Sequence, residues 1–128
     1  MGRMAKYKGK RGEYEFADIL GRAIEGKVIV NPHAQKGDIQ AIPGLSIEVK
    51  RQETLVVNTW WRQAVKQAEI EADIPVLAYR KNRGKWRVCL PAYLLTIKAR
   101  EGYIEMDLEV FLTWLREDYL GEVPKPIV

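Results

Sequence analysis

The sequence predicts one α/β domain spanning residues 1–128, in which a central mixed sheet of about five strands is flanked by helices. Helical periodicity near the start is followed by three short strand-like segments, a second helix, two more strand-like segments and a mostly helical tail. The chain has 128 residues, of which 47% are hydrophobic, so it is long enough for one core and too short for two.

The first helix is predicted over residues 12–23, where apolar residues recur at steps of three and four, at Phe16, Ala17, Leu20, Ala23 and Ile24. Glu13 lies on the face of this stripe, so we expect its carboxylate to point inward. Glu15 is rotated by about 200° from Glu13, so we expect it to be solvated beside Asp18 and Arg22. An inward acid at a helix start has a second explanation, because it also favours the helix dipole and caps free backbone N–H groups.

Three strands are predicted next, over residues 28–30, 38–42 and 45–50. In the third strand the apolar residues alternate strictly with Ser46, Glu48 and Lys50, so these three side chains share one face. An acid and a lysine two residues apart therefore point the same way from a half-buried strand.

A tight turn at Pro43-Gly44 joins the second and third strands, because proline fixes φ at the first central position and glycine accepts a positive φ at the second. The resulting hairpin is expected to place Asp38 near the end that carries Lys50, where it can share a metal with Glu48. Carboxylates beside a lysine can hold a divalent metal and activate water next to a phosphate. The pattern favours nuclease chemistry.

A second helix is predicted from Asn58 to Ala72, with Asn58 or Thr59 as its cap and a buried stripe of Trp61, Ala64, Val65, Ala68 and Ala72. Gln67 lies beside the stripe, and its spacing alone favours a surface position.

Two further strands are predicted over residues 74–79 and 85–90, joined by a turn at residues 81–84. The last predicted element is an amphipathic helix that ends at Gly121 and has an apolar stripe at Leu108, Phe111, Leu112, Leu115 and Tyr119.

The net charge of +4 is unevenly distributed along the chain. Residues 1–100 contain 19 Lys/Arg and 10 Asp/Glu, whereas residues 101–128 contain 2 and 7. Basic residues cluster between Arg3 and Arg11 and again between Arg80 and Arg87. Solvated charge explains either cluster alone equally well, but both flank the candidate metal site, which favours contacts with phosphate.

Other function classes find no support in the sequence. Cys89 is the single cysteine and lies in an apolar strand pattern, so we expect a small core residue and a reducing, cytosolic setting. His33 is the only histidine and receives no role in the chemistry. There is no Walker-type loop, paired CxxC or GxGxxG motif, and no apolar run of the roughly 18 residues that a membrane span requires. We therefore expect neither a nucleotide cofactor nor a membrane partner.

These residues resemble the PD-(D/E)xK nucleases, and most of all the archaeal-type Holliday junction resolvases, including versions carried by phages. The run Gly9–Phe16 is similar to the opening of that family, in which a basic, glycine-containing segment leads to an acid on the first helix. Asp38 matches the central aspartate of the family, and Glu48-Val49-Lys50 matches its ExK strand.

The resemblance continues through Trp61–Ala68, which is similar to a helix of related phage nucleases whose glutamine supports the site. It covers about residues 6–90 and implies a restriction-endonuclease-like domain with a mostly helical C-terminal extension over residues 91–128. The catalytic residues that it implies are Glu13, Asp38, Glu48, Lys50 and Gln67.

The resemblance also implies Mg²⁺, with Mn²⁺ as a substitute, held by Asp38, Glu48, Glu13 and the backbone carbonyl of Val49. The residues expected to contact DNA are Lys6, Lys8, Lys10, Arg11, Lys36, Arg51, Arg83 and Lys85.

The function implied is a metal-dependent endonuclease that resolves four-way DNA junctions by paired nicks. Paired incision implies a homodimer. The expected location is the cytoplasm, in association with DNA, which means the host cytoplasm if a phage encodes the chain. Two alternatives stay open: a general PD-(D/E)xK nuclease that cuts linear duplex, flaps or single strands, and a DNA-binding module without catalysis.

Overall fold

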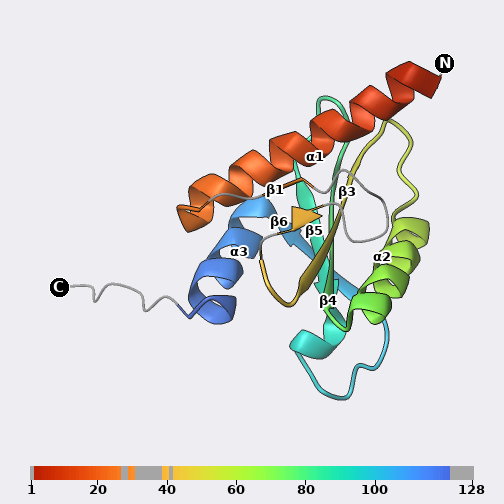
Figure 1. Ribbon diagram of the computed structural model, residues 1–128. Coiled ribbons are helices and arrows are strands. Elements are labelled where there is room, and N and C mark those ends of the chain that lie inside the picture. The colour runs from red at the N-terminus through yellow and green to blue at the C-terminus, as the bar shows by residue number, and fades with distance from the viewer. Residues whose placement is uncertain (1, 27–28, 31–38, 41, 122–128) are drawn as a thin grey trace.

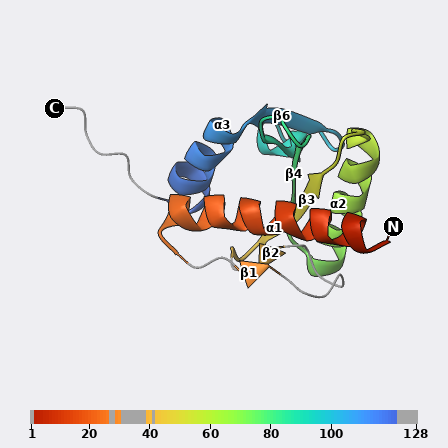
Figure 2. The same ribbon diagram turned by 90° about the horizontal axis from the view of Figure 1, so that it is seen from above.

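The computed structural model describes residues 2–26, 29–30, 39–40 and 42–121 of the chain. Its elements form three layers, in which a mixed sheet lies between helices (Figure 1). The helix α1 (Gly2–Ile24) and the C-terminal helix α3 (Leu108–Thr113) pack on one face of the sheet, and α2 (Val57–Glu71) packs on the other (Figure 2). The predicted α/β class is confirmed.

Within the described residues the sheet has six strands in chain order: β1 (Ile29–Val30), β2 (Ile39–Gln40), β3 (Leu45–Arg51), β4 (Ile74–Arg80), β5 (Arg87–Pro91) and β6 (Tyr103–Asp107). β3 and β4 are parallel and are joined through α2, whereas the other neighbours are antiparallel. The mixed character was predicted, but the strand count is six rather than about five.

The missed strand is β6, which falls in the segment predicted to be mostly helical. It pairs with β5 over five residues, and its Ile104 and Met106 pack against the main core. Five alternating residues between a glycine and a helix are a weak pattern, and β5 supplies the missing stabilisation. The segment after residue 91 is therefore built into the sheet as well as forming helix.

Two helix predictions also need correction. α1 begins at Gly2 instead of residue 12, because the basic residues before its apolar stripe are good helix formers that no proline interrupts. α2 begins after Val56 with no side-chain cap, since Asn58 instead accepts a 2.7 Å hydrogen bond from the hydroxyl of Tyr103. Ala72, predicted in the buried stripe, is an exposed C-cap with φ of 57°.

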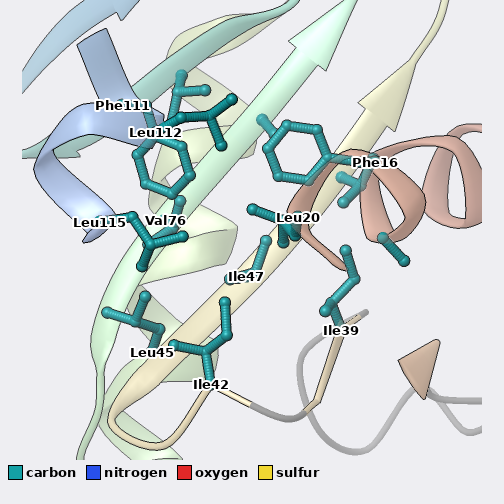
Figure 3. Close-up of a cluster of buried hydrophobic side chains, with 14 of the residues drawn as sticks. Phe16, Leu20, Ile39, Ile42, Leu45, Ile47, Val76, Phe111, Leu112 and Leu115 are labelled. Carbon is teal, nitrogen blue, oxygen red and sulfur yellow. The ribbon is translucent and has the colours of Figure 1, made fainter. Parts of the chain in front are cut away.

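The main core lies between α1, the sheet and the C-terminal helices (Figure 3). Phe16 and Leu20 of α1 face Ile47 of β3, while Phe111 and Leu115 close the same core from the other side. A second cluster lies under α2 and consists of Trp60, Trp61, Ala64, Leu77, Tyr79 and Cys89. Both faces of the β3–β4 pair are therefore covered by apolar side chains.

The turn that leads into β3 is fixed by glycine and by the last helix. Gly44 has φ of 86°, and the amide of Leu45 donates a 3.2 Å hydrogen bond to Ile42, as the sequence predicted for a Pro-Gly turn. The carbonyl of Pro43 accepts a hydrogen bond from the hydroxyl of Tyr119. Tyr119 is the last residue of the π-helix η2 (Trp114–Tyr119). The C-terminal helix thus anchors the start of the strand that carries Glu48.

Glu15 is the largest departure from the sequence-based expectation, which placed it in solvent. Its Oε1 accepts 2.8 Å hydrogen bonds from Nε of Arg80 and from the indole of Trp86. Its Oε2 accepts a 2.8 Å bond from Nη2 of Arg80 and lies 3.4 Å from Nη1 of Arg51. These contacts clamp α1 to β3, to the end of β4 and to the β4–β5 turn.

The Glu15 clamp also sets the acidity of that carboxyl. Burial by itself raises the pKa of Glu15, but the hydrogen bonds from Arg80 and Trp86 and the charges of Arg80 and Arg51 outweigh it. The pKa of Glu15 is therefore lower in the folded chain than its ordinary value.

Replacing Gly44 with alanine should lower the free energy of unfolding by about 1–3 kcal/mol, because alanine is strained at positive φ. Its Cβ would also collide with the hydroxyl of Tyr119. Denaturant unfolding measures the loss. Gly102→Ala is the matched control, since Gly102 has φ of 93° and open space around it. It should lose only the stability that corresponds to the backbone strain. Equal losses in both variants would mean that Tyr119 does not constrain the turn.

Glu15→Gln should lose stability relative to wild type above about pH 5, and the difference should shrink as the pH falls through the lowered pKa of Glu15. The sign follows because a depressed carboxyl pKa stabilises the fold only while the group is ionised. Thermal unfolding from pH 7 to pH 3 measures it. Asp18→Asn is the control, because its ion pair with Arg22 is exposed on the same helix and should contribute little. A difference that is constant with pH would contradict the expectation.

Candidate active site

The strand β3 places Glu48 and Lys50 on one face of the sheet, as the alternation predicted. Leu45, Ile47 and Val49 are buried in the main core, whereas Glu48 and Lys50 are half-buried. The parallel register sets Glu48 beside Leu77 and Lys50 beside Tyr79, two residues of the cluster under α2. The acid and the lysine therefore stand at the border of an apolar layer, where water screens charges less than in bulk solvent.

Glu13 approaches the same strand from α1. α1 packs closely on β3 at Gly12, where an added Cβ would lie only 2.9 Å from Cβ of Arg51. Glu13 follows Gly12 and so reaches β3 from the face that α1 covers, whereas Glu48 and Lys50 point to the face that α2 covers. Glu13 is half-buried, and its Oε2 is shielded from solvent, which agrees with the predicted inward direction.

Asp38, the third predicted carboxylate, lies outside the described residues, as do Lys36 and His33. The next residue in the chain, Ile39, is buried and pairs with Ile47, which directly precedes Glu48. No group of three His, Cys, Asp or Glu residues that could hold a metal occurs within the described ranges, from which Asp38 is missing. The donors that fit a hard divalent cation are carboxylate and carbonyl oxygens, and Glu13, Glu48 and Val49 supply these types.

A second polar network lies on the face that carries Lys50. The hydroxyl of Tyr79 donates a hydrogen bond to Oε1 of Glu105, and Nε of Arg87 donates to Oε2 of Glu105 at 3.2 Å. Burial, followed by the hydrogen bond to Glu105 and its charge, raises the pKa of Tyr79, so its hydroxyl stays protonated at neutral pH. The neighbour of Lys50 is thus a fixed hydrogen-bond donor rather than a second charge.

Cys89 belongs to this network as a buried thiol. Burial, with the charge of Glu105 as a further cause, raises the pKa of Cys89 to about 12. A thiol of that kind is protonated and unreactive at neutral pH. The prediction that Cys89 is a small core residue is confirmed by its complete burial.

Gln67 is half-buried on α2, and its side-chain amide donates a 3.0 Å hydrogen bond to Oε1 of Glu71 one turn later. Its position beside Ala64 and Ala68, which are buried, agrees with the predicted place next to the stripe. Its predicted role in supporting the site stays a prediction.

The basic residues predicted to contact DNA fall into separate groups. Arg83 and Lys85 are exposed on the β4–β5 turn, and Arg11 is exposed on α1. Lys6, Lys8 and Lys10 belong to the first half of α1. Arg51 differs from these, since it is half-buried and paired with Glu15, so part of its charge is already balanced within the fold.

Arg80 and Trp86 were not singled out individually from the sequence, although they hold Glu15 in the folded chain. Arg80 also donates a 2.9 Å hydrogen bond to the carbonyl of Lys81, and its guanidinium lies 5.5 Å from the ring centroid of Trp86. Both residues lie in the second basic cluster, where an arginine facing inward cannot be told from one facing solvent. No local pattern signals this pairing.

Comparison with known proteins identifies the family of the chain. Residues 4–113 match the family described as "Phage putative PDDEXK endonuclease". Protein D14 of Escherichia phage T5 is 29% identical over 112 residues, which cover 67% of this chain and 70% of that protein. No helix in the described part of the chain is long and apolar enough to cross a membrane.

Among solved structures, the chain is similar to Hjc of Archaeoglobus fulgidus, a Holliday junction resolvase from an archaeal hyperthermophile. The TM-score is 0.50 and the identity 26%, over 81% of this chain and 87% of that one. This match confirms the expected restriction-endonuclease-like fold. Because the family match spans most of the sequence, the chain belongs to the phage PDDEXK endonucleases.

Proposed function

We propose that the chain is a metal-dependent DNA endonuclease that resolves four-way junctions by paired nicks. The observation that carries the proposal is the placement of Glu48 and Lys50 on one half-buried face of β3, in a chain of the PDDEXK endonuclease family. The similarity to an archaeal Holliday junction resolvase supports the choice of substrate.

In this proposal Glu13, Asp38, Glu48 and the carbonyl of Val49 hold Mg²⁺, with Mn²⁺ as a substitute. Their oxygen atoms are the donors that both ions accept. Carboxylates gathered in one site repel one another, so a cation there lowers the cost of keeping them ionised. When bound, the metal supplies a Lewis acid for phosphodiester hydrolysis.

Lys50 orients the attacking water and adds positive charge beside the phosphate. Its amine extends from the face that also carries Tyr79, whose protonated hydroxyl adds no negative charge. Gln67 supports the site from α2. Positive charge fixed in advance stabilises the charge that develops on the phosphate during hydrolysis.

In this proposal DNA is held by cations of two segments that the Glu15 clamp joins. Lys6, Lys8, Lys10 and Arg11 contribute from α1, and Arg83 and Lys85 contribute from the β4–β5 turn. Lys36 and Arg51 complete the predicted set. The clamp joins α1 to that turn, so we propose that one substrate contacts both basic clusters.

Paired incision requires two active sites and each chain supplies one, so we propose a homodimer. Two other functions remain alternatives. A general nuclease would use the same residues on linear duplex, flaps or single strands. A binding module would hold DNA without needing a metal.

The first test is cleavage of a labelled four-way junction against matched duplex and flap, in Mg²⁺ or EDTA. Wild type should give paired nicks in the junction with Mg²⁺ only. Glu48→Ala should lower the rate at least about 10²- to 10³-fold, because it removes a metal ligand. Asp38→Asn should stop cleavage and keep affinity for the junction, since it removes a ligand without adding repulsion.

Each other outcome favours a named alternative. Equal cutting of all three substrates would indicate a general nuclease, and binding without cleavage would indicate a binding module. Sedimentation of the same preparation at micromolar concentration should give the mass of two chains. A monomer there would count against paired incision.

Replacing Arg83 and Lys85 together with alanine should weaken binding of all DNA sequences alike. It should make the slope of log K against log salt shallower by about 2, because two phosphate contacts are lost. Binding titrations between 50 and 200 mM salt, roughly the range over which such contacts weaken, measure both effects. The matched control is Lys98→Ala with Arg100→Ala, two exposed cations at the other end of β5. An unchanged slope in the Arg83/Lys85 variant would show that the turn does not touch phosphate.

A further inference from the structure

Glu13 and Glu15 lie on opposite flanks of the part of α1 that touches the sheet. Gly12 packs against Arg51, and Phe16, one turn later, is fully buried. At 100° per residue, Glu13 is rotated by about 60° to one side of Phe16 and Glu15 by about 100° to the other. One rotation of the helix therefore sets the directions of both carboxylates.

The sheet order shows where each flank points. α1 crosses β3, which has β2 on one side and β4 on the other. Glu15 is bound by Arg80 at the end of β4 and by Trp86 just before β5. The opposite flank, with Glu13, is therefore directed away from β4, toward the side of β3 on which β2 lies. Asp38 directly precedes β2 in the sequence.

The partners of Glu15 are themselves held in place. Arg80 is 12% exposed in its side chain, donates to the backbone of the β4–β5 turn and stacks on Trp86. The ring of Trp86 lies 5.0 Å from that of Phe16, so the indole packs against α1 while its N–H binds Glu15. The Glu15 carboxylate accepts from four nitrogen atoms, which belong to Arg80, Trp86 and Arg51. These contacts leave α1 little freedom to turn about its axis.

Small rotations of this helix matter for a catalytic carboxylate. Side chains reach about 6 Å from a helix axis, so a turn of about 10° moves a carboxylate by about 1 Å. A misplacement of about 1 Å in a reacting group can cost about 10²-fold in rate. By fixing the rotation of α1, the contacts of Glu15 on one flank therefore also fix the position of the Glu13 carboxylate on the other.

We propose that Glu15, through Arg80 and Trp86, is a positioning residue that fixes the rotation of α1 and so aims Glu13 at the metal-binding site. The proposal rests on the proposed function, in which Glu13 is a metal ligand. Glu15 itself faces away from that site and touches neither metal nor DNA. Its effect is exerted only through the direction of Glu13.

The test compares Glu15→Gln with Asp18→Asn, which removes the same charge from the same helix but only breaks an exposed pair with Arg22. Circular dichroism first fixes an assay temperature at which both variants are folded. Glu15→Gln should lower kcat for junction cleavage at least tenfold and leave KM within twofold. Calorimetric titration with Mn²⁺ should show binding weakened at least threefold. Asp18→Asn should match wild type in all three.

Trp86→Phe provides a second variant, since it keeps an aromatic ring beside Phe16 and removes the indole donor. It should shift kcat and Mn²⁺ binding in the same direction as Glu15→Gln. Wild-type kcat and Mn²⁺ binding in both variants would overturn the proposal. A change in KM alone would also overturn it, because that is the effect expected if the Glu15 contacts only shape the DNA-binding surface.

A double-mutant cycle separates this proposal from the function on which it rests. In a Glu13→Ala background, Glu15→Gln should cause no further loss of Mn²⁺ affinity or of residual cleavage. Additive losses would overturn the positioning role while leaving Glu13 a ligand. A Glu13→Ala variant with wild-type Mn²⁺ binding and cleavage would overturn the proposed role of Glu13, and the positioning role with it.

Discussion

The parallel pairing of β3 with β4 is the constraint on which the rest of the molecule depends. The ladder runs over all seven residues of both strands, from Leu45 beside Ile74 to Arg51 beside Arg80. Because side chains alternate along each strand, this one register supplies two apolar surfaces. α1 and α3 cover one of them, and α2 covers the other. Glu48 and Lys50 are polar exceptions on the surface that faces α2.

Long-range contacts fix the helix that brings Glu13 to this strand. Glu15 lies 65 residues from Arg80 and 71 from Trp86 in the sequence, yet all three form one hydrogen-bonded group. A partly buried carboxylate needs such donors, since burial alone would favour its protonated form. The same group joins the segment that carries the first basic cluster to the turn that carries the second.

The C-terminal segment contributes to the site without supplying a proposed catalytic group. β6 extends the sheet, and its Glu105 holds the hydroxyl of Tyr79, the neighbour of Lys50. Tyr119 contacts Pro43 at the entrance to β3. The endonuclease family match extends to residue 113, which includes β6 and α3. This segment therefore supports β3, the strand that carries Glu48 and Lys50.

The sequence by itself determined the elements whose patterns are local. The apolar stripe of α1, the alternation in β3 and the Pro43-Gly44 turn each follow from spacing and backbone preference, and they pointed to Glu13, Glu48 and Lys50. Only the tertiary structure decided which charges face inward. Glu15 shares its side of the helix with the exposed residues Arg11 and Asp18, so local spacing predicts a solvated acid. Arg80 and Trp86 give it partners that no local pattern encodes. Tertiary structure also decided β6, because a short strand is stable only where a neighbouring strand such as β5 pairs with it.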